Sequence, residues 1–120
     1  MKFIMMVHGK NHDGQPPEPK LLAAINKLAE EETKAGHMIF TGGLGGPNVN
    51  GVRLVASGGQ LSTVDGPFTE TKELIAGFAL MEFPTKEEAM GAARRFMKVH
   101  QEILGPKWEG TLEIHEVFTA

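Results

Sequence analysis

Runs of apolar residues predict four long strands in this chain. Residues 2–8, KFIMMVH, form a continuous apolar run that ends at Gly9, and such a run suits a strand that is covered on both faces. The segment LIAGFALMEF at 74–83 has the same character, and HMIFTGGL at 37–44 predicts a further strand that enters a glycine-rich loop. The last strand, TLEIHEVF at 111–118, alternates instead. The alternation places Leu112, Ile114 and Phe118 on one face and Glu113, His115 and Val117 on the other.

Two segments have the spacing of amphipathic helices. Pro19 suits a first helical position, where its missing N–H costs nothing, and the helix ends at Gly36. Its apolar stripe recurs at intervals of three and four, through Leu21, Leu22, Ile25, Leu28 and Ala29 to Glu32. Thr85 and Glu88 have the spacing of a capping box that opens a second helix. That helix continues through Ala89, Ala93, Phe96, Met97 and His100 and stops at the Gly-Pro pair 105–106.

The order of these elements predicts an α+β fold. The segments VRLVA and LSTV, joined by SGGQ, predict a hairpin at 52–64. Without that hairpin the order is βαββαβ, the ferredoxin-like pattern, in which both helices cover one face of an antiparallel sheet. The other face would then be bare, although the strands at 2–8 and 74–83 are apolar on both sides. A large apolar face is a partner site, so we expect a homodimer that forms a dimeric α+β barrel.

Composition narrows the class of protein. A chain of 120 residues and 13.0 kDa predicts a single domain over 1–120. A net charge of −3 without a basic run argues against direct nucleic-acid binding, and no run approaches the roughly 20 apolar residues of a membrane span. The chain has no cysteine, which excludes disulfides, thiolate chemistry and Cys-based zinc sites. We therefore expect a cytoplasmic protein that needs no cofactor.

The stretch VDGPFTETKE at 64–73 holds the densest group of candidate site residues. Asp65-Gly66-Pro67 is a turn signature, because Asp bonds its own downstream backbone and Pro fixes φ. Asp65 therefore has two interpretations, as the residue that ties this loop or as a base on a pocket wall. Phe68 is expected to plug the core or an interface.

The same loop carries three charged candidates. Residues two apart in an extended segment share a face, so Glu70 and Lys72 can both point toward a ligand. The alternative is a solvated ion pair that contributes little. Lys72 suits an anionic substrate, and Glu73 offers the opposite charge.

Histidines are the other candidates for proton transfer near neutral pH. His8 ends the first strand beside a loop, which is a position for a pocket wall, and the competing interpretation is a surface histidine. His115 lies on the strand face that would look into the barrel. His8, His12 and Asp13 match no metal-site spacing, so no metal is expected. His37 is expected at the surface, and His100 near a helix C-terminus, where the dipole favours charged imidazole.

Four segments together resemble a known family. DGPFTETKE, the N-terminal MKFIMMVHG, KAGHMIFTGGL after the first helix and GFALMEF after the loop are similar to the YCII-related family, and more closely to its branch named for the DGPF motif. The resemblance covers nearly the whole chain and implies a ferredoxin-like dimeric α+β barrel. It also implies lyase or isomerase chemistry, or regulation beside extracytoplasmic sigma factors. A His on the first helix and an Asp form the acid–base pair of YCII proteins, but residues 19–35 contain no His.

Two functions remain open. In the first, the protein binds a small organic acid between sheet and loops and acts as an acid–base lyase or isomerase. In the second, it is a non-catalytic ligand-sensing or regulatory module linked to sigma-factor-dependent transcription. The candidate catalytic residues are Asp65 and His8, and the candidate substrate-binding residues are Lys72, Glu73, Glu70, Phe68 and His115.

Overall fold

The computed structural model describes residues 1–9, 17–44, 51–65 and 75–119, and within these ranges it contains six strands and two helices. In chain order the elements are β1 (Lys2–Gly9), α1 (Pro19–Lys34), β2 (Met38–Gly43), β3 (Val52–Ser57), β4 (Gln60–Asp65), β5 (Gly77–Glu82), α2 (Lys86–Leu104) and β6 (Gly110–Val117). The order predicted from the apolar pattern is therefore confirmed.

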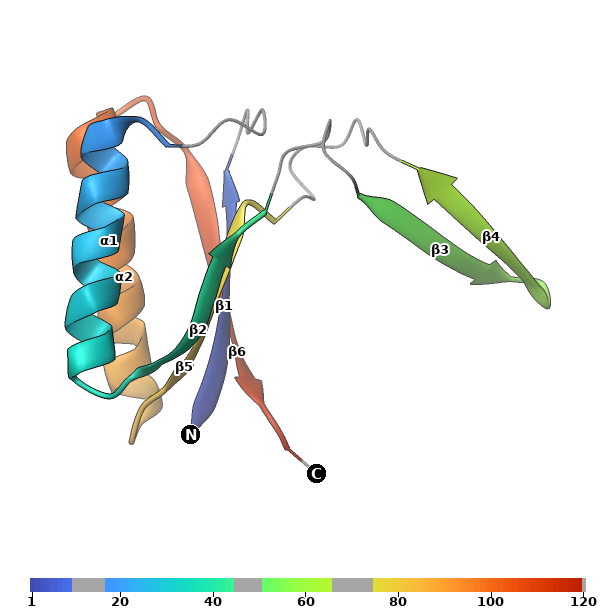
Figure 1. Cartoon of the computed structure of the whole chain (residues 1–120), viewed down its shortest axis with the longest axis horizontal. Helices are drawn as coiled ribbons and strands as arrows, with labels where there is room; N and C mark the ends of the chain where they lie inside the picture. The colour runs from blue at the N-terminus through green and yellow to red at the C-terminus, as the bar shows by residue number, and fades with distance from the viewer. Residues whose placement is uncertain (10–16, 45–50, 66–74, 120) are drawn as a thin grey trace.

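The four long strands form one antiparallel sheet in the order β2-β5-β1-β6. Both helices lie on the same face of this sheet, and the opposite face carries no helix (Figure 1). The two strands with the most apolar sequences, β1 and β5, are central, which is where both faces are most shielded. The architecture is α+β, as predicted, and it is compatible with a ferredoxin-like fold.

The core lies between the sheet and α2. Phe3 and Met5 on β1 are only 1% and 5% exposed, and Met81 on β5 is 4% exposed. These side chains pack against the small residues of α2, which include Ala89, Ala92 and Ala93. Alanine at the contact lets the helix approach closely, so the bulky residues come from the strands. Because successive strand residues point to opposite faces, Ile4, between Phe3 and Met5, faces away from the helices.

Local signals define the helix ends as predicted. Thr85 precedes α2 in extended conformation, and its hydroxyl accepts a hydrogen bond from the Glu88 N–H at 3.2 Å. At the other end, Gly105 has a φ of 86° and its N–H donates to the Gln101 carbonyl at 3.0 Å. Pro19 is the first residue of α1. In the described part of the chain, no helix is long and apolar enough to cross a bilayer.

The β3–β4 hairpin forms a separate two-stranded sheet. Its turn uses Gly58 and Gly59 at φ of 58° and 76°, values that suit a two-residue hairpin connection. Every residue from 52 to 65 is exposed, and the hairpin stands away from the four-stranded sheet on the side opposite the helices (Figure 1). The Cα radius of gyration is 15.9 Å, against about 13.6 Å for a compact domain of this length, which agrees with a projecting hairpin.

Three details differ from the predictions. Strand β5 begins at Gly77 rather than at 74, although the Ala76 N–H still donates to the Val7 carbonyl at 2.6 Å. Leu22 is 40% exposed, because α1 packs through the neighbouring Leu21 side of the helix. Phe118 lies beyond β6 and is 85% exposed. The last β6 pair is Val117 with Lys2, so Phe118 has no opposite residue on β1.

Candidate functional site

The helix-free face of the sheet, called here the open face, carries two of the predicted site residues, His8 and His115. The strand register places together the residues that alternate with the core: Ile4, Met6 and His8 on β1, Phe78 and Leu80 on β5, Phe40 on β2, and Thr111, Glu113 and His115 on β6. Phe40 and Phe78 confirm this arrangement, because their ring centroids lie 5.8 Å apart. The open face therefore has an apolar centre and a polar edge along β6.

His8 is the most unusual residue of this face. It lies near the end of β1, opposite Thr111. Both ring nitrogens, Nδ1 and Nε2, are shielded from solvent and have no hydrogen-bond partner in the described part of the chain. A buried polar group left without a partner costs about 1–3 kcal/mol. Native proteins tolerate few such groups, and each calls for an explanation. A ligand that bonds to His8 provides one.

His115 is placed on the open face, where the alternation of β6 puts it. Its Nε2 lies 3.2 Å from Oε2 of Glu113, and the side chains of His115 and Glu113 are 59% and 50% exposed. Four residues of extended chain, about 13 Å, separate His115 from Thr111, the residue opposite His8. Glu113 lies between them as the diagonal neighbour of His8, at a typical separation of about 7–8 Å. The role of His115 in substrate binding stays a prediction.

Asp65 is the last residue of β4 and lies opposite Val52. Its side chain is exposed, and no hydrogen bond or ion pair of its carboxylate occurs within the described ranges. The described contacts do not join Asp65 to His8. Phe68, Glu70, Lys72 and Glu73 lie outside the described residues. The choice between a structural and a chemical role for this loop therefore stays open.

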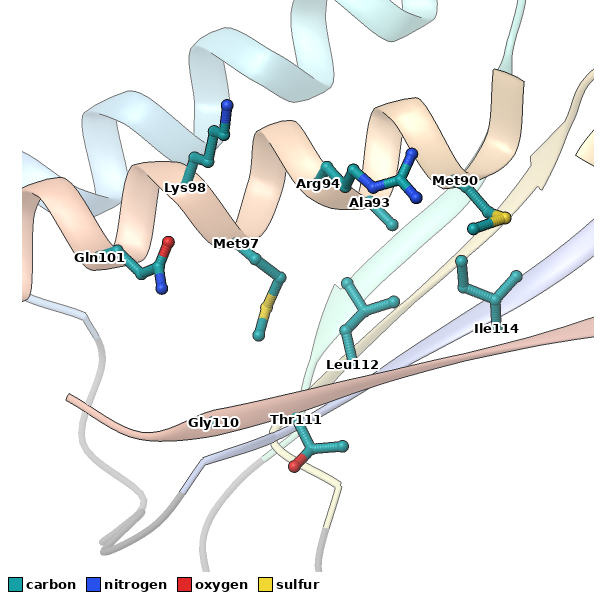
Figure 2. A pocket seen from close by; sticks show the side chains of 10 residues that line it. All are labelled: Met90, Ala93, Arg94, Met97, Lys98, Gln101, Gly110, Thr111, Leu112 and Ile114. Atoms are coloured by element: carbon teal, nitrogen blue, oxygen red, sulfur yellow. The ribbon is translucent and has the colours of Figure 1, made fainter. Parts of the chain in front are cut away.

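A pocket that was not predicted from the sequence lies between α2 and β6. It has a volume of about 440 Å³. Met90 and Met97 point down from the helix toward Leu112 and Ile114 on the strand (Figure 2). Lys98 points away from β6, and the Thr111 side chain lies on the side of the strand away from α2 (Figure 2). This groove is therefore an apolar edge of the core rather than a site for chemistry.

A cluster on the helix side of the sheet was also missed. Glu32 on α1 has a side chain only 13% exposed, and its carboxylate contacts Nδ1 of His37 at 2.7 Å and Nη2 of Arg95 at 2.9 Å. Burial raises the pKa of Glu32, but hydrogen bonds and charge from His37 and Arg95 outweigh it and leave the pKa below its ordinary value. His37 also packs on Phe83, with ring centroids 4.4 Å apart. The prediction that His37 is simply exposed was wrong, because Glu32, two residues before the end of α1, holds its ring. The cluster ties α1, α2 and the start of β2 together.

His100 also differs from its prediction. It is buried at 7% exposure, bonds through Nδ1 to the Phe96 carbonyl at 2.9 Å and packs between the rings of Phe96 and Trp108. Burial lowers its pKa, and the bond to the Phe96 carbonyl counters this only in part. The neutral form is thus favoured, which overturns the expectation of a charged imidazole at the helix dipole. His100 is a core residue.

No described group of three or more His, Asp or Glu side chains has metal-site geometry. Residues 12 and 13 of the HGKNHD segment lie outside the described ranges, so the expectation that no metal is needed stays a prediction.

Among known families, the model of the YCII-related domain matches residues 1–103, which run from β1 to nearly the end of α2. No curated protein matches the sequence.

Proposed function

The chain belongs to the YCII-related family, and we propose that it binds a small organic acid on the open face beside His8. In this proposal the protein is a ferredoxin-like dimeric α+β barrel with an inserted hairpin, and it acts as an acid–base lyase or isomerase. The observation that carries the proposal is the pair of shielded, unpartnered ring nitrogens of His8.

The chemistry of imidazole suits this role. Neutral imidazole has one N–H donor and one acceptor nitrogen, so His8 can donate a hydrogen bond to a carboxylate or take a proton from the substrate. Met6 lies two residues before His8 on the open face, and Phe78 lies opposite Met6, so the two offer an apolar wall on one side of His8 for the carbon skeleton. Asp65 is proposed as the second proton-transfer group. The DGPF loop that follows Asp65 would supply Lys72 as the partner of the carboxylate.

The dimer follows from the apolar centre of the open face. Ile4, Met6, Phe78 and Leu80 are only partly buried in one chain, and Phe40 is 61% exposed. A second copy related by a two-fold axis would cover the same face on both chains, which is the commonest way that an apolar patch becomes an oligomer interface. Sedimentation at micromolar concentration should then give about twice the mass of one chain.

His8→Phe tests the site, because a ligand-binding role and a structural role predict opposite signs. Phe has a similar ring but no nitrogens to leave unpaired, so we expect the variant to be more stable by about 1–2 kcal/mol in urea denaturation. In titrations with acetate, pyruvate and succinate, the variant should lose the binding that wild type shows. A residue that costs stability in exchange for binding is the expected signature of a functional site.

His115→Phe is the matched control, since His115 lies on the same face but is exposed and paired with Glu113. It should leave stability within about 0.5 kcal/mol. If His8→Phe is destabilised instead and binds each carboxylate as wild type does, His8 is a structural residue and the proposed site is wrong.

A non-catalytic sensor is the second candidate. It is favoured by the placement of Asp65 on the exposed hairpin without a described contact to His8. Binding of a carboxylate without any exchange of its α-protons in deuterated solvent would support the sensor over the enzyme.

A further inference from the structure

The β3–β4 hairpin, called here the arm, presents an apolar side to solvent. The register pairs Leu54 with Thr63 and Ala56 with Leu61, so Leu54 and Leu61 are diagonal neighbours on one side of the arm. Val52 lies on the same side. Their exposed fractions are 57% for Val52, 67% for Leu54 and 72% for Leu61. We refer to Val52, Leu54, Ala56 and Leu61 as the leucine face.

An arm of this kind needs a surface to pack on. A two-stranded hairpin alone is at best marginally stable in water, and a sheet of this size normally requires a further layer for stability. In the part of the chain that the structure describes, the arm packs extensively only between its own two strands. The arm also stands away from the sheet of its own chain (Figure 1). A layer from another molecule would supply what the described residues do not.

We propose that this molecule is a second copy of the chain, and that the leucine face packs on the partner's open face. The inference rests on the dimer in the proposed function. The arm projects on the helix-free side of the sheet (Figure 1), which is the side that such a dimer buries, so arm and interface are continuous.

Dimensions and composition fit this arrangement. Six residues of strand in β3 span roughly 20 Å, and four strands spaced about 4.8 Å apart are roughly 14 Å wide between the outer strands. One arm is thus long enough to lie along the β2 edge of the partner's open face, beside the area that the partner's sheet covers. Phe40, at the β2 edge of the face, is 61% exposed and offers an aromatic surface to the leucines. A two-fold axis makes the contact twice, once for each arm, so the assembly closes at two chains.

The arrangement has a consequence for the site. Phe40 packs near Phe78 on the open face, and Phe78 lies opposite Met6, two residues before His8 on β1. An arm on Phe40 would form part of the wall around the partner's His8. Each binding site would then be complete only in the dimer.

The first test compares the two sides of the arm. Leu54→Ser with Leu61→Ser removes the leucine face, while Val55→Ser with Val64→Ser makes a matched change on the opposite side, where the exposed fractions are 41% and 43%. In sedimentation equilibrium we expect the first pair to raise the dimer dissociation constant at least a hundredfold and the second pair to raise it less than threefold. Equal effects of the two pairs would contradict the proposal.

The second test uses the absence of native cysteine. A tagged chain with Leu54→Cys and an untagged chain with Phe40→Cys are mixed and oxidised, and a disulfide-linked heterodimer is the expected product. A tagged chain with Val55→Cys serves as the control and should give little of it. If a single chain that carries both Leu54→Cys and Phe40→Cys closes internally at high dilution and the mixture gives no heterodimer, the arm covers its own sheet and the proposal is wrong.

The two tests separate failure of the arm from failure of the dimer. A wild-type chain that sediments as a monomer at micromolar concentration overturns the proposed dimer and the arm contact with it. A wild-type dimer that survives loss of the leucine face, and gives no mixed disulfide, overturns the arm contact alone.

Discussion

The two faces of the four-stranded sheet are built from the same strands and both carry large apolar side chains, yet they differ sharply in burial. On the helix side Phe3 is 1% exposed. On the open side the next residue, Ile4, is only half buried, and Phe40 is 61% exposed. The helices explain the first face completely, because the alanines of α2 are matched to its bulky side chains. The difference teaches that the sequence encodes a second surface fit for a core, and that no layer among the described residues covers it.

The largest expected effect compares one phenylalanine from each face. Phe3→Ala should lower the free energy of unfolding by about 3–5 kcal/mol, the usual cost of emptying a buried aromatic position. Phe78→Ala should cost less in the monomer, because Phe78 is only half buried in one chain. Urea denaturation at nanomolar concentration, chosen to dissociate the proposed dimer, measures both values.

The same pair of variants also separates folding from association. Phe78→Ala should weaken the proposed dimer, and Phe3→Ala, once corrected for the lost stability, should leave its dissociation constant unchanged. Equal costs in the monomer and no effect of either variant on association would remove the distinction between the two faces.

The sequence predicted the start of α2 and the hairpin turn well, because their signals are local. Thr85 with Glu88 and the Gly58-Gly59 turn depend on neighbouring residues, and all form as expected. The alternation along β6 also predicted which of its residues lie on the open face, and His115 lies on the expected side. The contacts of Glu32 could not be predicted, because the carboxylate meets Arg95, a residue 63 positions away. The spacing of residues within α1 does not reveal which other helix α1 will pack against.

The Glu32 cluster gives the next effect in size, on the covered side. Glu32→Gln should lower the free energy of unfolding by about 1.5–3 kcal/mol, the range for hydrogen bonds to charged groups. Glu30→Gln is the matched control, because Glu30 is 66% exposed and pairs only with Lys34 one turn on. It should change stability by less than about 0.5 kcal/mol.

The sign of the pH dependence follows from the lowered pKa of Glu32. Because the folded pKa lies below the unfolded one, the unfolded chain binds the proton more readily in acid. The contribution of Glu32 is therefore fully present above the ordinary value of 4.5 and is lost as the pH falls below it. Wild type and Glu32→Gln should converge in stability as the pH drops through this range. Parallel curves would show that the carboxylate is not held by His37 and Arg95.

The smallest effect contrasts two histidines, one buried beside α2 and one on the open face. Burial lowers the pKa of His100, so the unfolded chain takes up a proton at a higher pH than the folded chain does. Stability from neutral His100 is then complete above the ordinary value of 6.5 and declines as the pH falls below it, by no more than about 1.4 kcal/mol per pH unit for one proton. His100→Gln should remove this slope, whereas His115→Gln, an exposed position on β6, should keep it. Urea denaturation between pH 5 and pH 7 measures all three chains. Because His100→Gln also loses the ring contacts with Phe96 and Trp108, the informative quantity is the slope with pH and not the stability at any one pH. A slope that survives in His100→Gln and disappears in His115→Gln would mean that the open face, and not the covered one, holds the histidine whose protonation is coupled to folding.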